Sequence, residues 1–181
     1  ACFEDCLLRV PLIIRVPGME PSGERNALCE LTDLYPSLME LIGLESKHYH
    51  YGQSLVPLMK GETDELRDAV FAEGGYHRDE IQFLPHIPAD SDYAVSSRKL
   101  RQNSQAGRKA AMVRTERYKY IYCPEDRDEL YDLQTDPEEL QNLADEESWQ
   151  TVRAEMRERL MQWMLHTADA LPMETDKRNW R

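Results

Sequence analysis

The chain has 181 residues, which suits one domain or a large piece of one. Its 34 acidic and 22 basic residues give a formal net charge of −12, so its surface repels phosphate backbones and bare anionic membranes, and we expect neither as a partner. Hydrophobic residues make up 41% of the chain, enough for a core, yet no apolar run approaches the roughly 20 residues of a membrane span.

The first third of the chain predicts a buried strand and then an amphipathic helix. Residues 8–16 hold a nearly continuous apolar run, which is typical of a strand covered on both faces in a parallel sheet. Residues 33–42 repeat apolar side chains at helical spacing, with Asp33 as the expected N-cap and Gly43 directly after the stripe. The stripe consists of Leu34, Leu38, Leu41 and Ile42.

A second strand and a long irregular segment follow. Residues 69–73 are a strand candidate that Gly74-Gly75 ends. Residues 76–109 show no clear period, and a segment of that length without regular structure is usually functional or disordered. Its basic run from Arg98 to Lys109 could meet an anion, but a solvated face is the more common role of such a run.

The last third predicts a small antiparallel sheet with a helical cover. Three short strands are expected at 111–115, 118–122 and 129–133, and their hairpin-length links favour antiparallel pairing. Residues 146–168 form the longest predicted helix. One side of it carries Trp149, Val152, Met156, Leu160, Trp163 and Met164. We expect this side, with Trp163 buried, to pack on the sheet, because so few strands are marginal without a cover.

Candidate ligand contacts follow the second strand. His77 and Arg78 come directly after Gly74-Gly75, and Glu73 lies four residues before His77. Strand ends with glycine loops are common places for ligand contacts, and both His77 and Arg78 can donate hydrogen bonds to anionic or hydroxylated groups. A plain loop histidine is the alternative.

No residue pattern predicts a catalytic centre or a metal site in this chain. There is no Gly-rich phosphate loop, no Gly-x-Ser-x-Gly elbow and no His-Glu-x-x-His. His48 and His50 could share a strand face, but they lack a third ligand nearby. The four cysteines are too few for a disulfide scaffold and lack zinc spacing, so free or buried thiols are expected.

Several segments, met in the same order along the chain, resemble the C-terminal half of sulfatases. They are residues 9–14, 33–43, 52–58 and 114–121 and the run Glu129-Leu130-Tyr131-Asp132-Leu133-x-x-Asp136-Pro137-x-Glu139-x-x-Asn142-Leu143. The last run is the most specific, and together the segments span about residues 3–168. The stretch around Gly74-Gly75 looks most like bacterial sulfatases of the sulfamidase, choline-sulfatase and iduronate-sulfatase type.

The resemblance implies an alkaline-phosphatase-like α/β fold that is α+β in its C-terminal part. The end of a large mixed sheet should be followed by a small antiparallel sheet under a long C-terminal helix. The implied domains are 1–75, the tail end of the catalytic α/β domain; 76–109, an irregular loop; 110–172, the antiparallel sheet and helix; and 173–181, a frayed tail.

The resemblance also implies the chemistry of a sulfuric-ester hydrolase. Sulfatases use a formylglycine made from a Cys or Ser in a Cys/Ser-x-Pro-x-Arg motif, and a calcium ion polarises the sulfate. This chain has no such motif, since Pro124 follows Cys123 directly. We therefore expect the nucleophile and the calcium ligands upstream of this chain, no metal bound by the chain, and no activity from it alone. Glu73, His77 and Arg78 would then border the pocket for a sulfated small molecule or carbohydrate.

Two alternatives stay open. One is a phosphodiesterase or phosphonate hydrolase on the same scaffold, which a lone upstream Thr nucleophile would favour. The other is a non-catalytic interaction module, although the apolar run at 10–14 has no partner strand nearby in sequence. The absence of an initial Met and of a secretory signal suggests that residue 1 is not a natural start. Substrate, oligomeric state and compartment stay open, with the bacterial cytoplasm or periplasm as the expected locations.

Overall fold

The structure is a computed structural model that describes residues 3–20, 23–76, 87–88, 90–95, 98 and 107–168. Its helices are α1 (Asp5–Leu8), α2 (Leu34–Leu41), α3 (Val56–Lys60) and α5 (Gln150–Thr167). Its strands are β1 (Ala69–Gly74), β2 (Ala110–Thr115), β3 (Tyr118–Tyr122) and β4 (Glu129–Asp132), and short 3-10 turns occupy Leu31–Asp33 and Glu147–Trp149. None of the described helices is long and apolar enough to cross a membrane.

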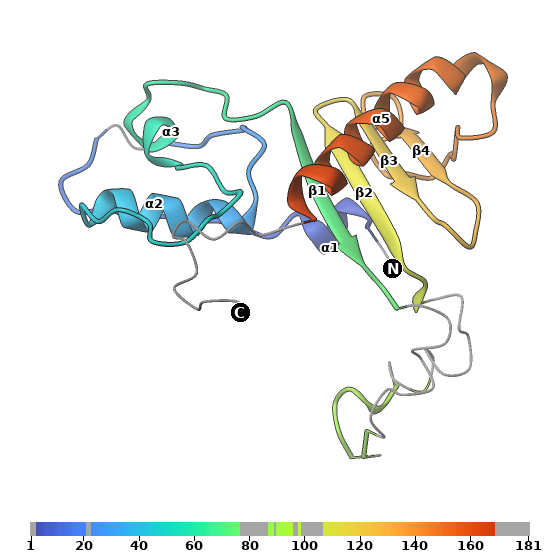
Figure 1. Ribbon diagram of the computed structural model, residues 1–181, viewed down its shortest axis with the longest axis horizontal. Helices are drawn as coiled ribbons and strands as arrows, with labels where there is room; N and C mark the ends of the chain where they lie inside the picture. Colours follow the sequence, from blue (N-terminus) through green and yellow to red (C-terminus); the bar gives the residue numbers. More distant parts are fainter. Residues whose placement is uncertain are drawn as a thin grey trace, which may run out of the picture. The chain divides into compact units, whose positions relative to one another are not determined.

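The chain divides into two compact units. The sheet unit comprises Ala1–Pro11 and Phe71–Leu160, and the helical unit comprises Leu12–Val70 and Met161–Arg181. Figure 1 shows β2, β3 and β4, which lie wholly in the sheet unit, and the short helices α2 and α3, which lie in the helical unit. Both β1 and α5 run across the boundary, since the first two residues of β1 and the last seven of α5 fall in the helical unit.

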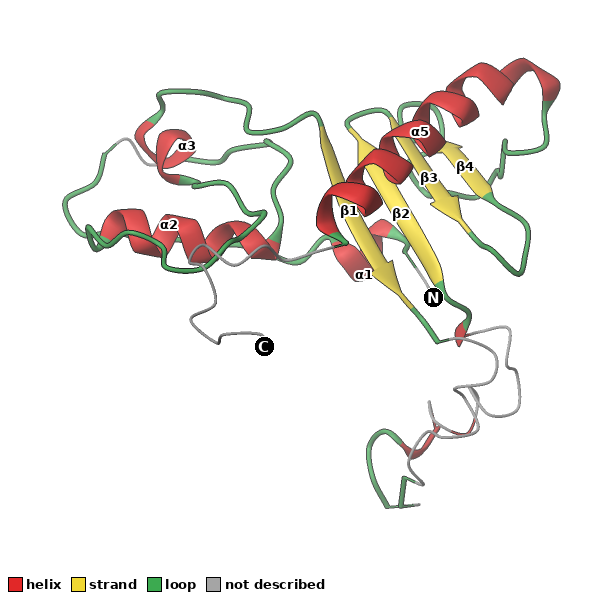
Figure 2. Ribbon diagram, viewed as in Figure 1, coloured by secondary structure: helices red, strands yellow, loops and turns green. Residues whose placement is uncertain are grey.

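A four-stranded sheet in the order β1-β2-β3-β4 forms the centre of the sheet unit (Figure 2). β3 pairs antiparallel with both β2 and β4, so Met112 lies opposite Ile121 and Tyr120 lies opposite Leu130. The predicted antiparallel pairing of the last three strands is therefore confirmed. The mixed α/β class is confirmed as well.

One face of the sheet, called here the Phe3 face, is covered by the start of the chain. Because directly opposed residues of an antiparallel pair share a face, Met112 and Ile121 point the same way. They pack with Phe3, which is 4% exposed, and with Tyr131 in one apolar cluster. Residues more than a hundred positions apart thus form this part of the core.

The opposite face, called here the α5 face, is covered by the long helix. Val113, Tyr120 and Leu130 are each 0% exposed there. The rings of Tyr118 and Trp149 meet edge to face with centroids 6.1 Å apart, at the start of α5. These contacts confirm the predicted helical cover of the sheet.

The depth of this cover differs from the prediction. Only Met156 and Leu160 of the predicted helix stripe are fully buried, at 2% exposure each. Trp163 is half-buried and Met164 is 42% exposed, so the expectation of a buried Trp163 is wrong. The physical reason is that the sheet encloses only the middle of the stripe, where Met156 and Leu160 lie one turn apart, and leaves the tryptophans at its two ends half-buried.

The predicted strand at 8–16 is also absent. Residues 5–8 form α1, and the segment after it has no regular structure, with Ile13 93% exposed. A strand needs a hydrogen-bonded neighbour, and no described segment pairs with this one.

The helix predicted at 33–42 is present as α2, but only Leu34 and Leu41 of its apolar stripe are half-buried. Leu38 is 59% exposed and Ile42 is 62% exposed. The best-buried residues of this region are polar instead. Asp33 accepts hydrogen bonds from the backbone N–H groups of Glu30 (2.7 Å) and Gln53 (2.8 Å). Asp33 therefore precedes the helix as predicted, but its carboxylate organises the loops around α2 rather than capping it.

Candidate functional site

The three residues predicted to contact a ligand belong to the segment at the end of β1. Glu73 lies in β1 and is exposed to solvent. His77 and Arg78 lie outside the described residues. The structure therefore places one of the three, and their predicted grouping stays a prediction.

The exit from β1 is fixed by Gly75. This glycine has a φ of +84°, and a Cβ built on it would lie 2.0 Å from the carbonyl oxygen of Arg108. Next to it, the Tyr76 N–H donates to the Gly107 carbonyl at 2.7 Å, and the Lys109 N–H donates to the Tyr76 carbonyl at 3.0 Å. Tyr76 and Gly107, which flank this segment, therefore lie side by side.

We expect Gly75→Ala to destabilise the sheet unit more than Gly43→Ala destabilises the helical unit, in which Gly43 lies. Both glycines have positive φ, which costs an alanine on the order of 1 kcal/mol. Only Gly75 also faces a backbone carbonyl, whereas nothing lies within 4 Å of a Cβ at Gly43. Urea unfolding of the two variants measures the difference, and equal losses would contradict the close approach at Gly75.

The basic side chain next to this exit already has an anionic partner. Arg108 forms a 2.7 Å ion pair with Asp126 and donates to the Glu125 carbonyl at 2.6 Å. This pairing holds the entrance of β2 to the loop before β4. For Arg108, the observed role is therefore structural.

A buried cluster of charged residues lies on the Phe3 face of the sheet, and it was not predicted. The side chain of Lys119 is 0% exposed. Its ammonium group donates to Asp5 Oδ1 at 2.5 Å, to Glu139 Oε1 at 2.6 Å and to the Phe3 carbonyl at 3.0 Å. Arg114 donates to the second oxygen of Asp5 at 3.2 Å. Two cations thus balance two carboxylates, with Lys119 and Glu139 buried and Asp5 and Arg114 partly exposed.

This charged cluster ties the start of the chain to the sheet. Burial raises the pKa of Asp5, but the hydrogen bonds and charges of Lys119 and Arg114 outweigh it and hold that pKa below its usual 3.8. Glu139 adopts a φ of +57°, uncommon for a residue other than glycine, and accepts the Asp5 N–H at 3.0 Å. A buried and paired lysine cannot reach a substrate, so the cluster acts as a structural clamp.

Asn142, in the most specific sequence motif, binds backbone groups around β4. Asn142 accepts the N–H groups of Leu130 (3.1 Å) and Ala144 (2.9 Å) and donates to the Asp128 carbonyl at 3.0 Å. These bonds join β4 to the chain that leads into α5. Asn142 therefore fixes how the polypeptide turns between β4 and α5.

Asp132, in the same motif, forms a two-point pair with Arg117. Its two oxygens accept from Arg117 Nε at 3.1 Å and Nη2 at 2.9 Å, and Asp132 itself is 1% exposed. The hydrogen bond from Arg117 lowers the pKa of Asp132 below its ordinary value of 3.8. The ionised carboxylate is thus the form that the fold favours.

This shift predicts an acid-dependent loss of stability. A carboxyl group whose pKa is depressed by folding stabilises the fold above its unfolded pKa of about 3.9, and that stabilisation is lost as the pH falls through the lower folded value. As the pH is lowered below about 4, we expect the urea concentration at the unfolding midpoint of the wild-type chain to decrease. The decrease should be less steep for Asp132→Asn. Asp64→Asn, at an exposed position, is the matched control. If the pH dependence below about pH 4 were the same for Asp132→Asn and the wild type, the stabilising role of the ionised Asp132 would be refuted.

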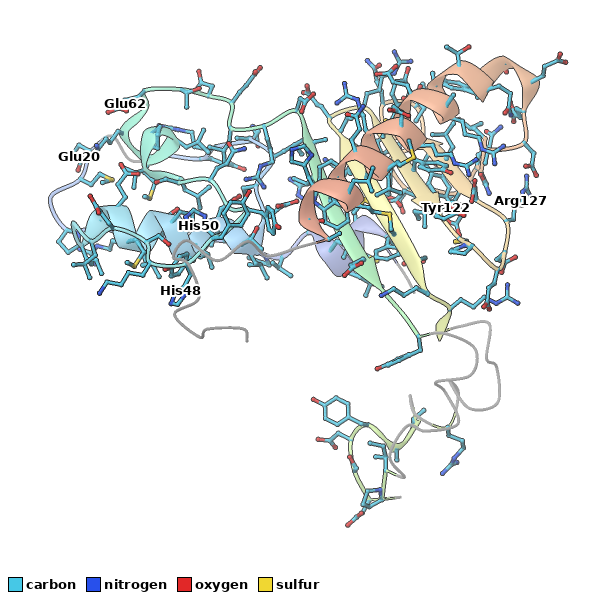
Figure 3. All side chains as sticks on the ribbon, in the orientation of Figure 1. Glu20, His48, His50, Glu62, Tyr122 and Arg127 are labelled. Atoms are coloured by element: carbon cyan, nitrogen blue, oxygen red, sulfur yellow. The ribbon has the colours of Figure 1, made fainter. Side chains whose placement is uncertain are left out.

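No metal-binding group of three or more His, Cys, Asp or Glu residues occurs in the part of the chain that the structure describes. The predicted pair of histidines lies on the loop after α2 (Figure 3). His50 Nδ1 donates to the Gly52 carbonyl at 3.1 Å, and its ring meets the ring of Tyr35 edge-on with centroids 5.4 Å apart. His48 is exposed. The described residues therefore do not fit the calcium ion that the resemblance implies.

Comparison with known proteins agrees with the motif. Residues 101–166 match the family described as N-sulphoglucosamine sulphohydrolase, C-terminal. The choline-sulfatase of Rhizobium meliloti is 29% identical over 185 aligned residues, which cover 98% of this chain and 30% of that protein. A solved 2-O GAG sulfatase is 27% identical, with a TM-score of 0.55 over 76% of this chain and 25% of the other. The chain is therefore similar to the C-terminal parts of sulfatases.

Sulfatases of this kind have the alkaline-phosphatase-like fold, and that superfamily also contains hydrolases of other esters. The phosphonate monoester hydrolase of Agrobacterium radiobacter is 26% identical to the chain, with a TM-score of 0.54 over 79% of this chain and 28% of the other. The chain spans about a third of the length of the curated sulfatases that it matches.

Proposed function

We propose that this chain is the C-terminal portion of a sulfuric-ester hydrolase and supplies scaffold and part of the rim of its substrate pocket. The observation that carries the proposal is the match of residues 101–166 to the sulphohydrolase C-terminal family. Asp132, Glu139 and Asn142 of the shared motif all bind partners in the sheet unit, which supports a common local structure.

The nucleophile and the calcium ligands of the intact enzyme lie upstream of this chain. Calcium would supply Lewis-acid polarisation of the sulfate there. Within the chain, residues 1–75 form the tail end of the catalytic domain, 76–109 a loop, and 110–172 the C-terminal sheet and helix, with 173–181 as a tail. The substrate is a sulfated small molecule or carbohydrate, in keeping with relatives named choline-sulfatase and GAG sulfatase.

The pocket rim is assigned to Glu73, His77 and Arg78. Glu73 is exposed at the end of β1, and the pairing of Tyr76 with Gly107 fixes where the following segment begins. An imidazole and a guanidinium directly after this point offer donors for sulfate or hydroxyl oxygens.

A kinetic comparison tests the proposed function. The intact parent should hydrolyse an aryl sulfate in a calcium-dependent manner, whereas the 181-residue chain should give no turnover above a heat-killed control. In the parent, His77→Ala and Arg78→Ala should each lower kcat/KM by about tenfold, the loss of roughly one charge-assisted hydrogen bond. The exposed His48→Ala is the control. If kcat/KM were unchanged in both His77→Ala and Arg78→Ala, the proposal that these residues border the pocket would be wrong.

The likeness to a phosphonate monoester hydrolase favours one alternative, an enzyme of the same fold that cleaves phosphonate or phosphate diesters. The parent should be assayed with an aryl sulfate, an aryl phosphonate monoester and an aryl phosphodiester under one set of conditions. The highest kcat/KM on the sulfate supports the sulfatase proposal. A higher value on either phosphorus ester would replace it with the alternative.

A further inference from the structure

The loop after α2 gathers aromatic and basic side chains that the proposed function does not use. Residues 46–52 read Ser-Lys-His-Tyr-His-Tyr-Gly and are called here the tyrosine loop. Between Glu45 and Glu62 the chain has two lysines, two histidines and no acidic residue, although 34 of its 181 residues are acidic. An anion therefore meets a local attraction at this loop, on a chain whose overall charge repels it.

The two tyrosines of the loop form an exposed aromatic pair. The rings of Tyr49 and Tyr51 meet edge to face with centroids 5.0 Å apart, and the two residues are 48% and 38% exposed. The ring of His50, which stands between them in sequence, contacts Tyr35 of α2 instead. The ring contacts thus place His50 against the helix and leave the tyrosine pair open to solvent.

The loop is held at both ends by contacts with the helical segment before it. The Ser46 hydroxyl lies 3.1 Å from the Tyr35 hydroxyl and donates to the His48 carbonyl at 2.6 Å. At the other end, a Cβ built on Gly52 would lie 2.1 Å from the carbonyl oxygen of Thr32, so the two backbones are in close contact. A loop fixed in this way loses little conformational freedom when a ligand binds, which favours affinity.

An exposed aromatic pair beside a lysine fits the chemistry of a sulfated sugar. Tyrosine rings bury the C–H surface of a ligand with little loss of side-chain entropy, and their hydroxyl groups bind its polar atoms. The ammonium group of the exposed Lys47, two residues before Tyr49, can donate charge-assisted hydrogen bonds to sulfate oxygens. A long nucleic acid fits less well, because the stretch without acidic residues is short and the rest of the chain repels phosphates.

We propose that the tyrosine loop binds a sugar unit of a sulfated carbohydrate and holds such a substrate at a place separate from the pocket rim. The loop belongs to the helical unit, whereas Glu73 of the rim belongs to the sheet unit. Tyr49 and Tyr51 stack on the sugar, and Lys47 binds its sulfate group. This inference rests on the proposed function and narrows the substrate class from sulfated small molecules to sulfated carbohydrates.

Binding of a fluorescent dextran sulfate oligosaccharide to the intact parent tests the stacking. Tyr49→Ala and Tyr51→Ala should each weaken the affinity by about tenfold, whereas Tyr49→Trp should retain it, because the aromatic face is kept. Tyr93→Ala is the control, since Tyr93 is 73% exposed and lies outside the loop. Unchanged melting temperatures would show that the losses are local. Unchanged affinity in both alanine variants would overturn the proposal.

The charge of the ligand is tested with the same binding assay. Lys47→Gln should weaken the binding of dextran sulfate severalfold, whereas Arg127→Gln, which removes an exposed cation of the sheet unit, should not. Unsulfated dextran of equal length should bind at least about tenfold more weakly. Equal binding of the two dextrans would overturn the sulfated ligand. Equal displacement of dextran sulfate by single-stranded DNA would overturn the proposal in favour of a general polyanion surface.

Kinetics of the parent separate this site from the pocket rim. On a sulfated oligosaccharide, the double variant Tyr49→Ala/Tyr51→Ala should raise KM at least about tenfold and leave kcat unchanged. On an aryl sulfate, both constants should stay as in the wild type. An equal rise of KM on both substrates would overturn the separate site. A parent that binds dextran sulfate through the tyrosine loop but hydrolyses no sulfate ester would refute the proposed function and leave the binding site in place.

Discussion

Lys119→Met is expected to lower the free energy of unfolding of the sheet unit by about 3–5 kcal/mol, the usual cost of breaking a buried ion pair. The ammonium group is wholly buried and donates to Asp5, Glu139 and the Phe3 carbonyl. Methionine fills much of the volume but leaves the buried Glu139 carboxylate without its cation, while the partly exposed Asp5 keeps only Arg114. Urea unfolding followed by tryptophan fluorescence measures the loss, because Trp149, one of three tryptophans, contacts the sheet through Tyr118.

Two controls separate the buried pairing from a general effect of removing a lysine. Lys60→Met removes an exposed lysine whose ammonium lies 3.9 Å from Glu62, and it should change stability by no more than about 0.5 kcal/mol. Adding Glu139→Leu to Lys119→Met should recover part of the loss, because one uncompensated charge is removed. A loss below about 1 kcal/mol for Lys119→Met would contradict the clamp.

Leu160→Ala should destabilise the sheet unit by about 2–5 kcal/mol, the range for deleting a buried leucine side chain. Leu160 is 2% exposed on the helix that covers the α5 face. The polar contacts of the same helix hold its position, since Arg153 pairs with Asp128 at 2.8 Å, so the shortened side chain leaves a cavity rather than a repacked helix. Thermal and urea unfolding of the variant measure the effect.

The same experiment ranks the residues of the helix stripe. Trp163→Ala should cost less than Leu160→Ala, because Trp163 is only half-buried. Leu165→Ala, at a 74% exposed position, should stay within about 0.5 kcal/mol of the wild type. If Trp163→Ala cost more than Leu160→Ala at every protein concentration, the burial described for α5 would be wrong.

The residues behind the resemblance to sulfatases make structural contacts in this chain. Glu139 belongs to the motif that most specifically resembles sulfatases, and its carboxylate holds Lys119 rather than a substrate. Asn142 likewise binds backbone groups around β4. A match to this motif therefore reports the local fold directly. It reports the reaction only through the relatives that share it.

The sequence alone determined the elements whose signals are local. The strands of residues 110–133 follow from alternating side chains and short links, and α5 follows from an apolar stripe with helical spacing. Gly74-Gly75 marked the end of β1, and the structure supplies the reason in the positive φ of Gly75 and its contact with the Arg108 carbonyl. The sequence signals of these elements come from residues close together in the chain, so they are visible without a fold, whereas the contact of Gly75 with Arg108 is not.

Only the tertiary structure decided the features that depend on distant partners. Residues 12–14 have the composition of a buried strand, but strand formation needs a neighbour that composition does not provide. Lys119 looks like an ordinary charged residue in an aromatic strand, and its burial becomes visible only when Asp5 and Glu139, 114 and 20 residues away, are brought to it. The helical repeat predicted that Leu160 and Trp163 are both buried, but in the structure only Leu160 is fully buried. A repeat shows which side of a helix faces the sheet, and it does not show how deeply each side chain on that side is buried.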